Sequence, residues 1–255
     1  MDYYDEYLER SLWGPSERLQ AWLASRVVSE FVEQAGLSPS SSDLLEIGSG
    51  TGRIGVVAGE LGFRSYTGVE PATALADYAR AHHGLRILDE ELPHLLSIPD
   101  GAFDAVISMH VIEHAPGYLD AREWLAEMTR CVSFGGYVAI VAPNYLDYKA
   151  FFWDADWSHG FPTTPARIAQ ILNDLQMEVT VATSMHLGRT GSVAAASARL
   201  LSLLIPTRLV DTITVRVIGR PLGSGLKIAM LWGLTFVVAR KPQPPVAHAS
   251  MPRQS

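Results

Sequence analysis

A short apolar strand that runs directly into three alternating glycines constrains this chain more than any other feature. Residues 43–55 spell D-L-L-E-I-G-S-G-T-G-R-I-G, so the apolar run ends in a turn that holds Gly48, Gly50 and Gly52. Glycine permits the backbone of a sharp turn and lets a ligand approach the main chain closely. A helix expected from about Arg53 would point its free amide groups at that ligand. The pattern predicts a loop that binds a nucleotide-like cofactor.

The acidic residue Glu46 beside this loop helps to decide which of two kinds of cofactor the loop would bind. The dinucleotide pattern G-x-G-x-x-G fits only Gly50, Gly52 and Gly55, and this frame begins two residues after the first glycine, Gly48. Glu46 would repel a pyrophosphate, whereas it suits a ligand that carries an ammonium and a sulfonium group. The pattern E-x-G-x-G-x-G resembles motif I of the class I S-adenosylmethionine (SAM) dependent methyltransferases. An NAD-dependent oxidoreductase is the less favoured alternative.

Acidic residues end the next two predicted strands. Residues 66–70 form a strand that ends in Glu70, whose carboxylate can accept both ribose hydroxyls of SAM or of NAD. Residues 86–89 form a third strand, which is followed by a Leu-Pro pair. This segment resembles the methyltransferase segment whose acid contacts the adenine amino group. The resemblance implies that Asp89 or Glu90 makes this contact.

Two later stretches extend the resemblance. Residues 101–114 match the family's fourth strand and loop, G-x-F-D-x-V-x-S-x-x-V-x-E-H, and residues 134–144 match its Gly-Gly turn and fifth strand. The resemblance covers about residues 40–145 and narrows to small-molecule methyltransferases related to the ubiquinone-biosynthesis enzymes. It implies that SAM is the cofactor and S-adenosylhomocysteine the product. The implied cofactor-binding residues are Glu46, Gly48, Ser49, Gly50, Gly52, Glu70, Pro71, Asp89, Glu90, Met109 and His110.

The order of the predicted elements indicates an α/β fold. Strands at 43–47, 65–69, 85–88, 103–108 and 136–142 alternate with helical stretches, and right-handed crossovers then build a doubly wound, mostly parallel sheet. Helices are predicted over 15–35 and 165–175. Two further strands, near 178–183 and 231–239, complete a seven-stranded Rossmann-like sheet with an antiparallel edge, as in the family, and helices cover both faces.

We expect a single domain over residues 1–241. Its cofactor-binding core spans about residues 40–145, and an acceptor lid with a C-terminal helical insertion spans about residues 146–230. The sequence from residue 242 onward is rich in proline and lacks periodicity, which predicts a disordered tail.

Composition and charge exclude several functions. The chain has 255 residues and a net charge of −7, and it contains no run of Lys or Arg, which argues against a nucleic-acid substrate. Its only cysteine, Cys131, excludes a disulfide framework. The acidic start lacks a secretory pattern, so a cytoplasmic location is expected. Apolar runs at 192–205 and 226–239 are too short and too interrupted by charge to span a membrane. They favour a helix that packs in the core or forms a homodimer, followed by the last strand of the sheet, and docking on a membrane surface or an apolar substrate is the alternative.

Histidines are the candidates for acid–base chemistry. Methyl transfer from an activated sulfonium mainly needs an in-line nucleophile and the exclusion of water. A histidine becomes useful when the acceptor is a hydroxyl that must lose a proton. We expect His159 and His114 to be the catalytic residues, and ordinary hydrogen-bonded histidines are the alternative. The aromatic segment 151–157 predicts a lid over an aromatic or apolar small-molecule acceptor.

The sequence favours no resident metal ion. Residues 110–114 spell H-x-x-E-H, but this zinc-protease pattern belongs on one face of a helix, and here it follows a buried strand. A divalent ion held by Glu113, His114 and His159 is a minor alternative. The acidic composition and the position of His110 argue against it. The predicted function is therefore SAM-dependent methylation of a small acceptor at oxygen. A non-catalytic binding or assembly module with the same fold is the alternative from another class.

Overall fold

The computed structural model describes residues 15–186, 188–190, 197, 212–213, 216–217 and 233–244. Within the predicted lid and insertion over residues 146–230, most of the part after residue 186 lies outside the described residues, as does the predicted tail from residue 245 onward. No helix among the described residues is long and apolar enough to cross a membrane.

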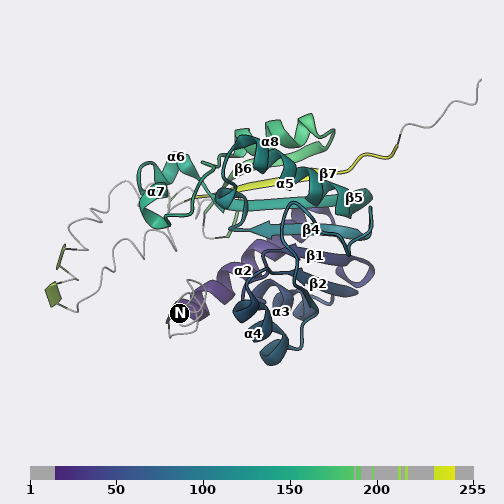
Figure 1. Cartoon of the computed structure of the whole chain (residues 1–255), viewed down its shortest axis with the longest axis horizontal. Coiled ribbons are helices and arrows are strands. Elements are labelled where there is room, and N and C mark those ends of the chain that lie inside the picture. The colour runs from purple at the N-terminus through teal and green to yellow at the C-terminus, as the bar shows by residue number, and fades with distance from the viewer. Residues whose placement is uncertain are drawn as a thin grey trace, which may run out of the picture.

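A seven-stranded mixed sheet forms the centre of the protein, in the order β3-β2-β1-β4-β5-β7-β6 (Figure 1). All neighbours from β3 to β5 pair in parallel, and β7 pairs antiparallel with both β5 and β6. The predicted doubly wound sheet with an antiparallel edge is confirmed. The strands are β1 Asp43–Ile47, β2 Ser65–Val69, β3 Ile87–Leu88, β4 Phe103–Met109, β5 Val132–Pro143, β6 Glu178–Met185 and β7 Leu234–Arg240.

The helices connect these strands in the predicted order. They are α2 Pro15–Ala35, α3 Arg53–Glu60, α4 Thr73–His83, α5 Tyr118–Cys131, α6 Tyr145–Tyr148, α7 Phe151–Ala155 and α8 Pro165–Asp174, with 3-10 turns η1 Pro39–Ser41 and η2 Ile112–His114. The segment between β5 and α8, which includes the aromatic stretch 151–157, contains two short helices, α6 and α7, which lie beside each other in Figure 1.

The strands alternate between two apolar cores, one on each face of the sheet. Leu45 and Val106 face a core that α5 and α8 cover, whereas Leu44 and Ile107 face a core that α2 and α3 cover. Such strands are apolar on both sides, as a sheet covered by helices on both faces requires. β7 is likewise buried in the sheet, in agreement with the strand predicted near 231–239.

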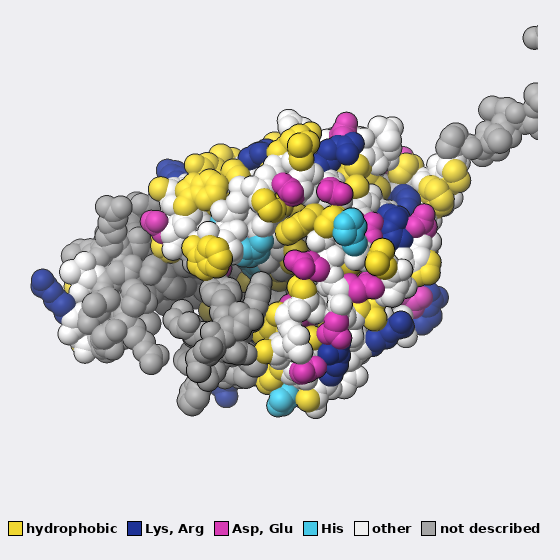
Figure 2. All heavy atoms as spheres, viewed as in Figure 1, with side chains coloured by type: hydrophobic (Ala, Val, Ile, Leu, Met, Phe, Trp, Pro, Cys, Tyr) yellow, Lys and Arg dark blue, Asp and Glu magenta, His cyan; other side chains and the backbone are white. Residues whose placement is uncertain are grey.

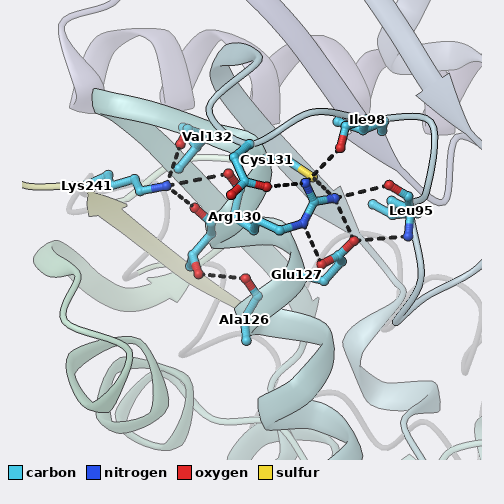
Figure 3. A network of polar contacts seen from close by, with 10 residues as sticks. Leu95, Ile98, Ala126, Glu127, Arg130, Cys131, Val132 and Lys241 are labelled. Carbon is cyan, nitrogen blue, oxygen red and sulfur yellow. Dashed lines mark hydrogen bonds and ion pairs between the residues drawn. The ribbon is translucent and has the colours of Figure 1, made fainter.

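Basic side chains gather at the C-terminal end of α5 (Figure 3). The Arg130 guanidinium donates to the carbonyl oxygens of Ile98 at 2.7 Å and Leu95 at 3.1 Å, and it pairs with Glu127 at 2.7 Å. Lys241, which follows β7, donates from Nζ to carbonyl oxygens of the last turn of α5 and of β5. Cations at a helix C-terminus satisfy carbonyls that have no partner within the helix. These contacts join the β3–β4 loop and the end of β7 to α5.

We predict that Arg130→Met lowers the free energy of unfolding by about 2–3 kcal/mol, because two carbonyls and Glu127 lose a charged donor. The measurement is urea denaturation. Arg122→Met is the matched control on the same helix, since Arg122 forms only a solvent-exposed pair with Asp174 at 2.8 Å among the contacts of the described residues. Its expected effect is below about 0.5 kcal/mol. Equal effects of the two substitutions would contradict the role of Arg130.

Candidate functional site

The glycine loop after β1 lies against the end of β2. The amides of Gly48 and Ser49 both donate to the carbonyl oxygen of Val69, at 2.9 and 3.0 Å. The φ angles of Gly48, Gly50 and Gly52 are +74°, +53° and +83°, which glycine adopts without strain. A Cβ placed on Gly50 would meet no atom within 4 Å, so the space outside the loop is open. The loop thus presents bare backbone just before the N-terminus of α3.

Glu70 joins the end of β2 to this loop. Its Oε2 accepts from the Gly50 amide at 2.7 Å, and its Oε1 accepts from the Ala72 amide at 3.0 Å. Burial raises the pKa of Glu70, and the two amides oppose that rise. Pro71, the next residue, is exposed. The carboxylate is therefore fixed beside the open side of the glycine loop.

Glu46 lies beneath the loop and is engaged within the protein. Its carboxyl group accepts a hydrogen bond from the Tyr66 hydroxyl on β2. Burial raises the pKa of Glu46 well above its usual range, and burial likewise raises the pKa of Tyr66. A contact of Glu46 with a ligand ammonium stays a prediction, and the contact that the structure shows is with Tyr66.

The two acids considered for the adenine contact differ in their surroundings. Asp89 is exposed and pairs with Arg80 of α4 at 2.6 Å. Glu90 accepts from the Ser97 amide through Oε1 at 2.9 Å, while its Oε2 is buried and has no hydrogen-bond partner among the described residues. An unpaired buried oxygen costs free energy unless a ligand donates to it. Glu90 thus has an oxygen that a ligand could use, and the adenine contact of Asp89 or Glu90 stays a prediction.

Thr51 was not among the residues predicted from the sequence. Its side chain is buried in the glycine loop, and its Oγ1 also lacks a hydrogen-bond partner within the described part of the chain. Its position between Gly50 and Gly52 could have identified Thr51 as a candidate, since a hydroxyl there lies within the turn itself.

The chain turns sharply after β4, where Met109 is half-buried. His110 adopts a φ of +60°, a conformation uncommon outside glycine, and its Nδ1 lies 3.1 Å from Glu113 Oε1. Glu113 is only 1% exposed, and its Oε2 has no hydrogen-bond partner among the residues described. This turn brings Glu113 and His114 to the sheet edge where the glycine loop and Glu70 lie.

Aromatic side chains of α6 and α7 pack over this turn. The Phe152 ring is fully buried and lies 4.5 Å from the His159 ring and 5.7 Å from the Tyr145 ring, measured between centroids. Trp153 and Trp157 are exposed. Figure 2 shows apolar side chains gathered at the surface over α6 and α7, with a histidine side chain nearby. The predicted aromatic segment thus has some side chains that pack inside the protein and others that are exposed.

The structure brings together the two histidines predicted as catalytic. The rings of His114 and His159 lie 5.1 Å apart between centroids. Nδ1 of His159 lies 2.6 Å from the Phe152 carbonyl oxygen, and Nδ1 of His114 lies 2.8 Å from Ser158 Oγ. The Ser158 hydroxyl itself donates to Asp156 at 2.6 Å. Burial lowers the pKa of His114, which favours its neutral form.

Backbone contacts hold this pair in place. The amides of Gly160 and Phe161 both donate to the Glu113 carbonyl oxygen, at 2.9 and 3.0 Å. A Cβ on Gly160 would lie 2.5 Å from the Ala115 carbonyl oxygen, so the segment approaches the turn closely because residue 160 is glycine. The positions of His159 and His114 are therefore coupled through the main chain.

Comparison with known proteins identifies the domain. Residues 45–140 match the model of a family described as a methyltransferase domain. No curated protein matches the chain. The structure resembles a SAM-dependent methyltransferase from Archaeoglobus fulgidus, with 19% identity and a TM-score of 0.61, over 94% of this chain and 100% of that one.

Two other solved structures share the fold. One is a complex of the Haloferax volcanii Trm112 methyltransferase activator with a methyltransferase, with 15% identity and a TM-score of 0.64, over 95% of this chain and 99% of that one. The other is geranyl diphosphate C-methyltransferase from Streptomyces coelicolor, in complex with Mg²⁺, geranyl diphosphate and S-adenosylhomocysteine. It has 16% identity and a TM-score of 0.59, over 88% of this chain and 80% of that one.

The narrower resemblance to ubiquinone-biosynthesis enzymes stays a prediction. Identities this low establish the fold, and the family match adds the methyltransferase assignment for residues 45–140. Residues 45–140 therefore resemble a methyltransferase domain, and the chain has the fold of solved SAM-dependent methyltransferases.

Proposed function

We propose that this protein transfers the methyl group of SAM to a hydroxyl oxygen of a small-molecule acceptor. The observation that carries this proposal is the position of three groups at one sheet edge. The open glycine loop and Glu70 end β1 and β2, and His114 follows β4 in the same layer. Open α/β sheets bind their ligands at this edge.

The cofactor is proposed to lie along the ends of β1 to β3. Glu70 accepts the ribose hydroxyls, and the loop from Gly48 to Gly52 surrounds the methionine moiety. Glu90 meets the adenine amino group in preference to Asp89, because its Oε2 has no hydrogen-bond partner among the described residues. Thr51 Oγ1 supplies a further polar contact. These groups suit SAM, since buried carboxylates are stabilised by a ligand that carries positive charge.

The acceptor is proposed to enter between the turn after β4 and the wall of α6 and α7. His114 is neutral near pH 7 because burial lowers its pKa, so one ring nitrogen is available to accept a proton. As the new oxygen–carbon bond forms and the sulfur–carbon bond breaks, the hydroxyl proton passes to His114 or His159. Phe152 and Trp153 favour an aromatic or apolar acceptor.

We predict that Glu70→Gln weakens the binding of S-adenosylhomocysteine by about 10- to 100-fold, because a charged acceptor of two hydroxyl donors is lost. Isothermal titration calorimetry measures this affinity, and thermal unfolding without ligand reports whether the fold is retained. Glu60→Gln, at the exposed end of α3, is the control and should bind as the unmodified protein does. An unchanged affinity for Glu70→Gln would remove Glu70 from the site.

Gly160→Ala should lower the free energy of unfolding by about 1–3 kcal/mol, since the added methyl group meets a backbone carbonyl. Amide hydrogen exchange of Gly160 and Phe161 should also increase, because their bonds to the Glu113 carbonyl weaken. Gly59→Ala is the matched control, since a Cβ there meets no atom within 4 Å and the helix should be stabilised slightly. If both variants are equally stable, the close approach does not hold this segment.

The activity itself is tested by incubating the protein with isotope-labelled SAM and a panel of small phenols and aliphatic alcohols. We expect label on the oxygen of one acceptor class and no binding of NAD in a parallel titration. Labelled amine or carbon products from matched acceptors would contradict O-methylation. Binding of S-adenosylhomocysteine without transfer to any acceptor would favour the non-catalytic module instead.

A further inference from the structure

Three side chains with metal-ligating atoms converge beneath α6 and α7. One carboxylate oxygen of Glu113 and one ring nitrogen each of His114 and His159 all lie within 4.8 Å of one another. They come from two segments of the chain, the turn η2 and the stretch after α7, which the bonds from Gly160 and Phe161 to the Glu113 carbonyl hold together. The convergence therefore has a fixed backbone support.

The hydrogen bonds of the two imidazoles determine which nitrogen is protonated. A carbonyl oxygen only accepts, so Nδ1 of His159 carries the hydrogen that it donates to Phe152. The single hydroxyl hydrogen of Ser158 goes to Asp156, so Ser158 can only accept from Nδ1 of His114. In the neutral form of both rings Nε2 then keeps a free lone pair. Both histidines therefore present an acceptor nitrogen.

Glu113 adds a third acceptor atom to the cluster. Its Oε1 contacts Nδ1 of His110, whereas Oε2 is buried and has no hydrogen-bond partner among the residues that the structure describes. Among the ion pairs of the described residues, Glu113 pairs only with His110. Burial and, to a smaller extent, the Glu113 carboxylate raise the pKa of Tyr148. A glutamate with an unpaired buried oxygen, clustered with two imidazoles that each keep a lone pair, forms a set of acceptors that a cation would satisfy.

We propose that Glu113, His114 and His159 bind a divalent transition-metal ion of the Zn²⁺ type. Two histidines and one glutamate leave a coordination position open, as in catalytic zinc sites. Imidazole ligands favour Zn²⁺, Co²⁺ or Fe²⁺, whereas Mg²⁺ and Ca²⁺ prefer oxygen ligands alone. The bonds from Nδ1 of each ring to Phe152 and Ser158 are the outer contacts that orient metal-binding histidines.

The role of the ion rests on the proposed function. The open position would take the acceptor oxygen, and a hydroxyl bound there loses its proton more readily. That proton then leaves to water, and the two histidines act through the ion in place of accepting the proton themselves. The binding of the ion itself does not depend on methyl transfer.

The test uses the untagged full chain after treatment with a chelator, titrated with Co²⁺ and followed by visible absorption. We expect one Co²⁺ per chain, displacement by Zn²⁺, and no displacement by millimolar Mg²⁺. His159→Gln should lower the Co²⁺ affinity by more than about 100-fold, and Ser158→Ala, which removes an outer contact, by about 10- to 100-fold. His82→Gln on α4 is the control, because this exposed histidine is not part of the cluster, and should bind Co²⁺ normally.

The proposal is overturned if the unmodified chain takes up no Co²⁺, if His159→Gln binds it equally well, or if His82→Gln loses it to the same extent. Should His159→Gln fail to fold, an unchanged affinity in Ser158→Ala overturns it instead. Calorimetry with S-adenosylhomocysteine on the metal-free chain separates the two proposals. Binding of this ligand without Co²⁺ uptake rejects only the ion site, and the reverse result rejects only the proposed function.

Discussion

The parallel pairing of β1 with β2 on one side and with β4 on the other determines where every functional group of this domain lies. Ile47 pairs with Val69 and with Ser108, so the three strands end in one layer. Parallel strands present their carboxyl ends at the same edge, and the chain must leave that edge through a loop. The glycine loop, Glu70 and the turn after β4 are those exits. The geometry of the site is therefore a consequence of strand register.

The features that could be predicted depend on local sequence, whereas contacts between distant segments could not be predicted in detail. The strand, glycine turn and helix around residue 48 follow from neighbouring residues, so they were predictable. The pairing of Asp89 with Arg80 was not, because it requires α4 to pack beside β3. The sequence suggested that His159 and His114 meet, but it did not reveal the support for this pair, which is two backbone hydrogen bonds and the missing side chain of Gly160.

Three buried glutamates lie in the candidate site, and each has a different hydrogen-bond partner. Glu46 has a phenol hydroxyl, Glu70 has two backbone amides, and Glu113 has an imidazole. Burial raises the pKa of Glu46 and of Glu70, so desolvation of these two carboxyl groups is only partly offset within the protein. A sulfonium cofactor and a metal ion would each add positive charge to this edge. Ligands with positive charge would therefore stabilise the buried carboxylates.

The position of β7 between β5 and β6 has a consequence for synthesis of the chain. β6 leaves the ribosome before β7, yet β7 is the strand with which β6 pairs in the finished sheet. Until β7 has been translated, β5 and β6 both expose unpaired backbone and apolar side chains, which makes a nascent or truncated chain prone to aggregation. Completion of the sheet therefore has to wait for the last strand, and a chaperone that shields β5 and β6 would act in that interval.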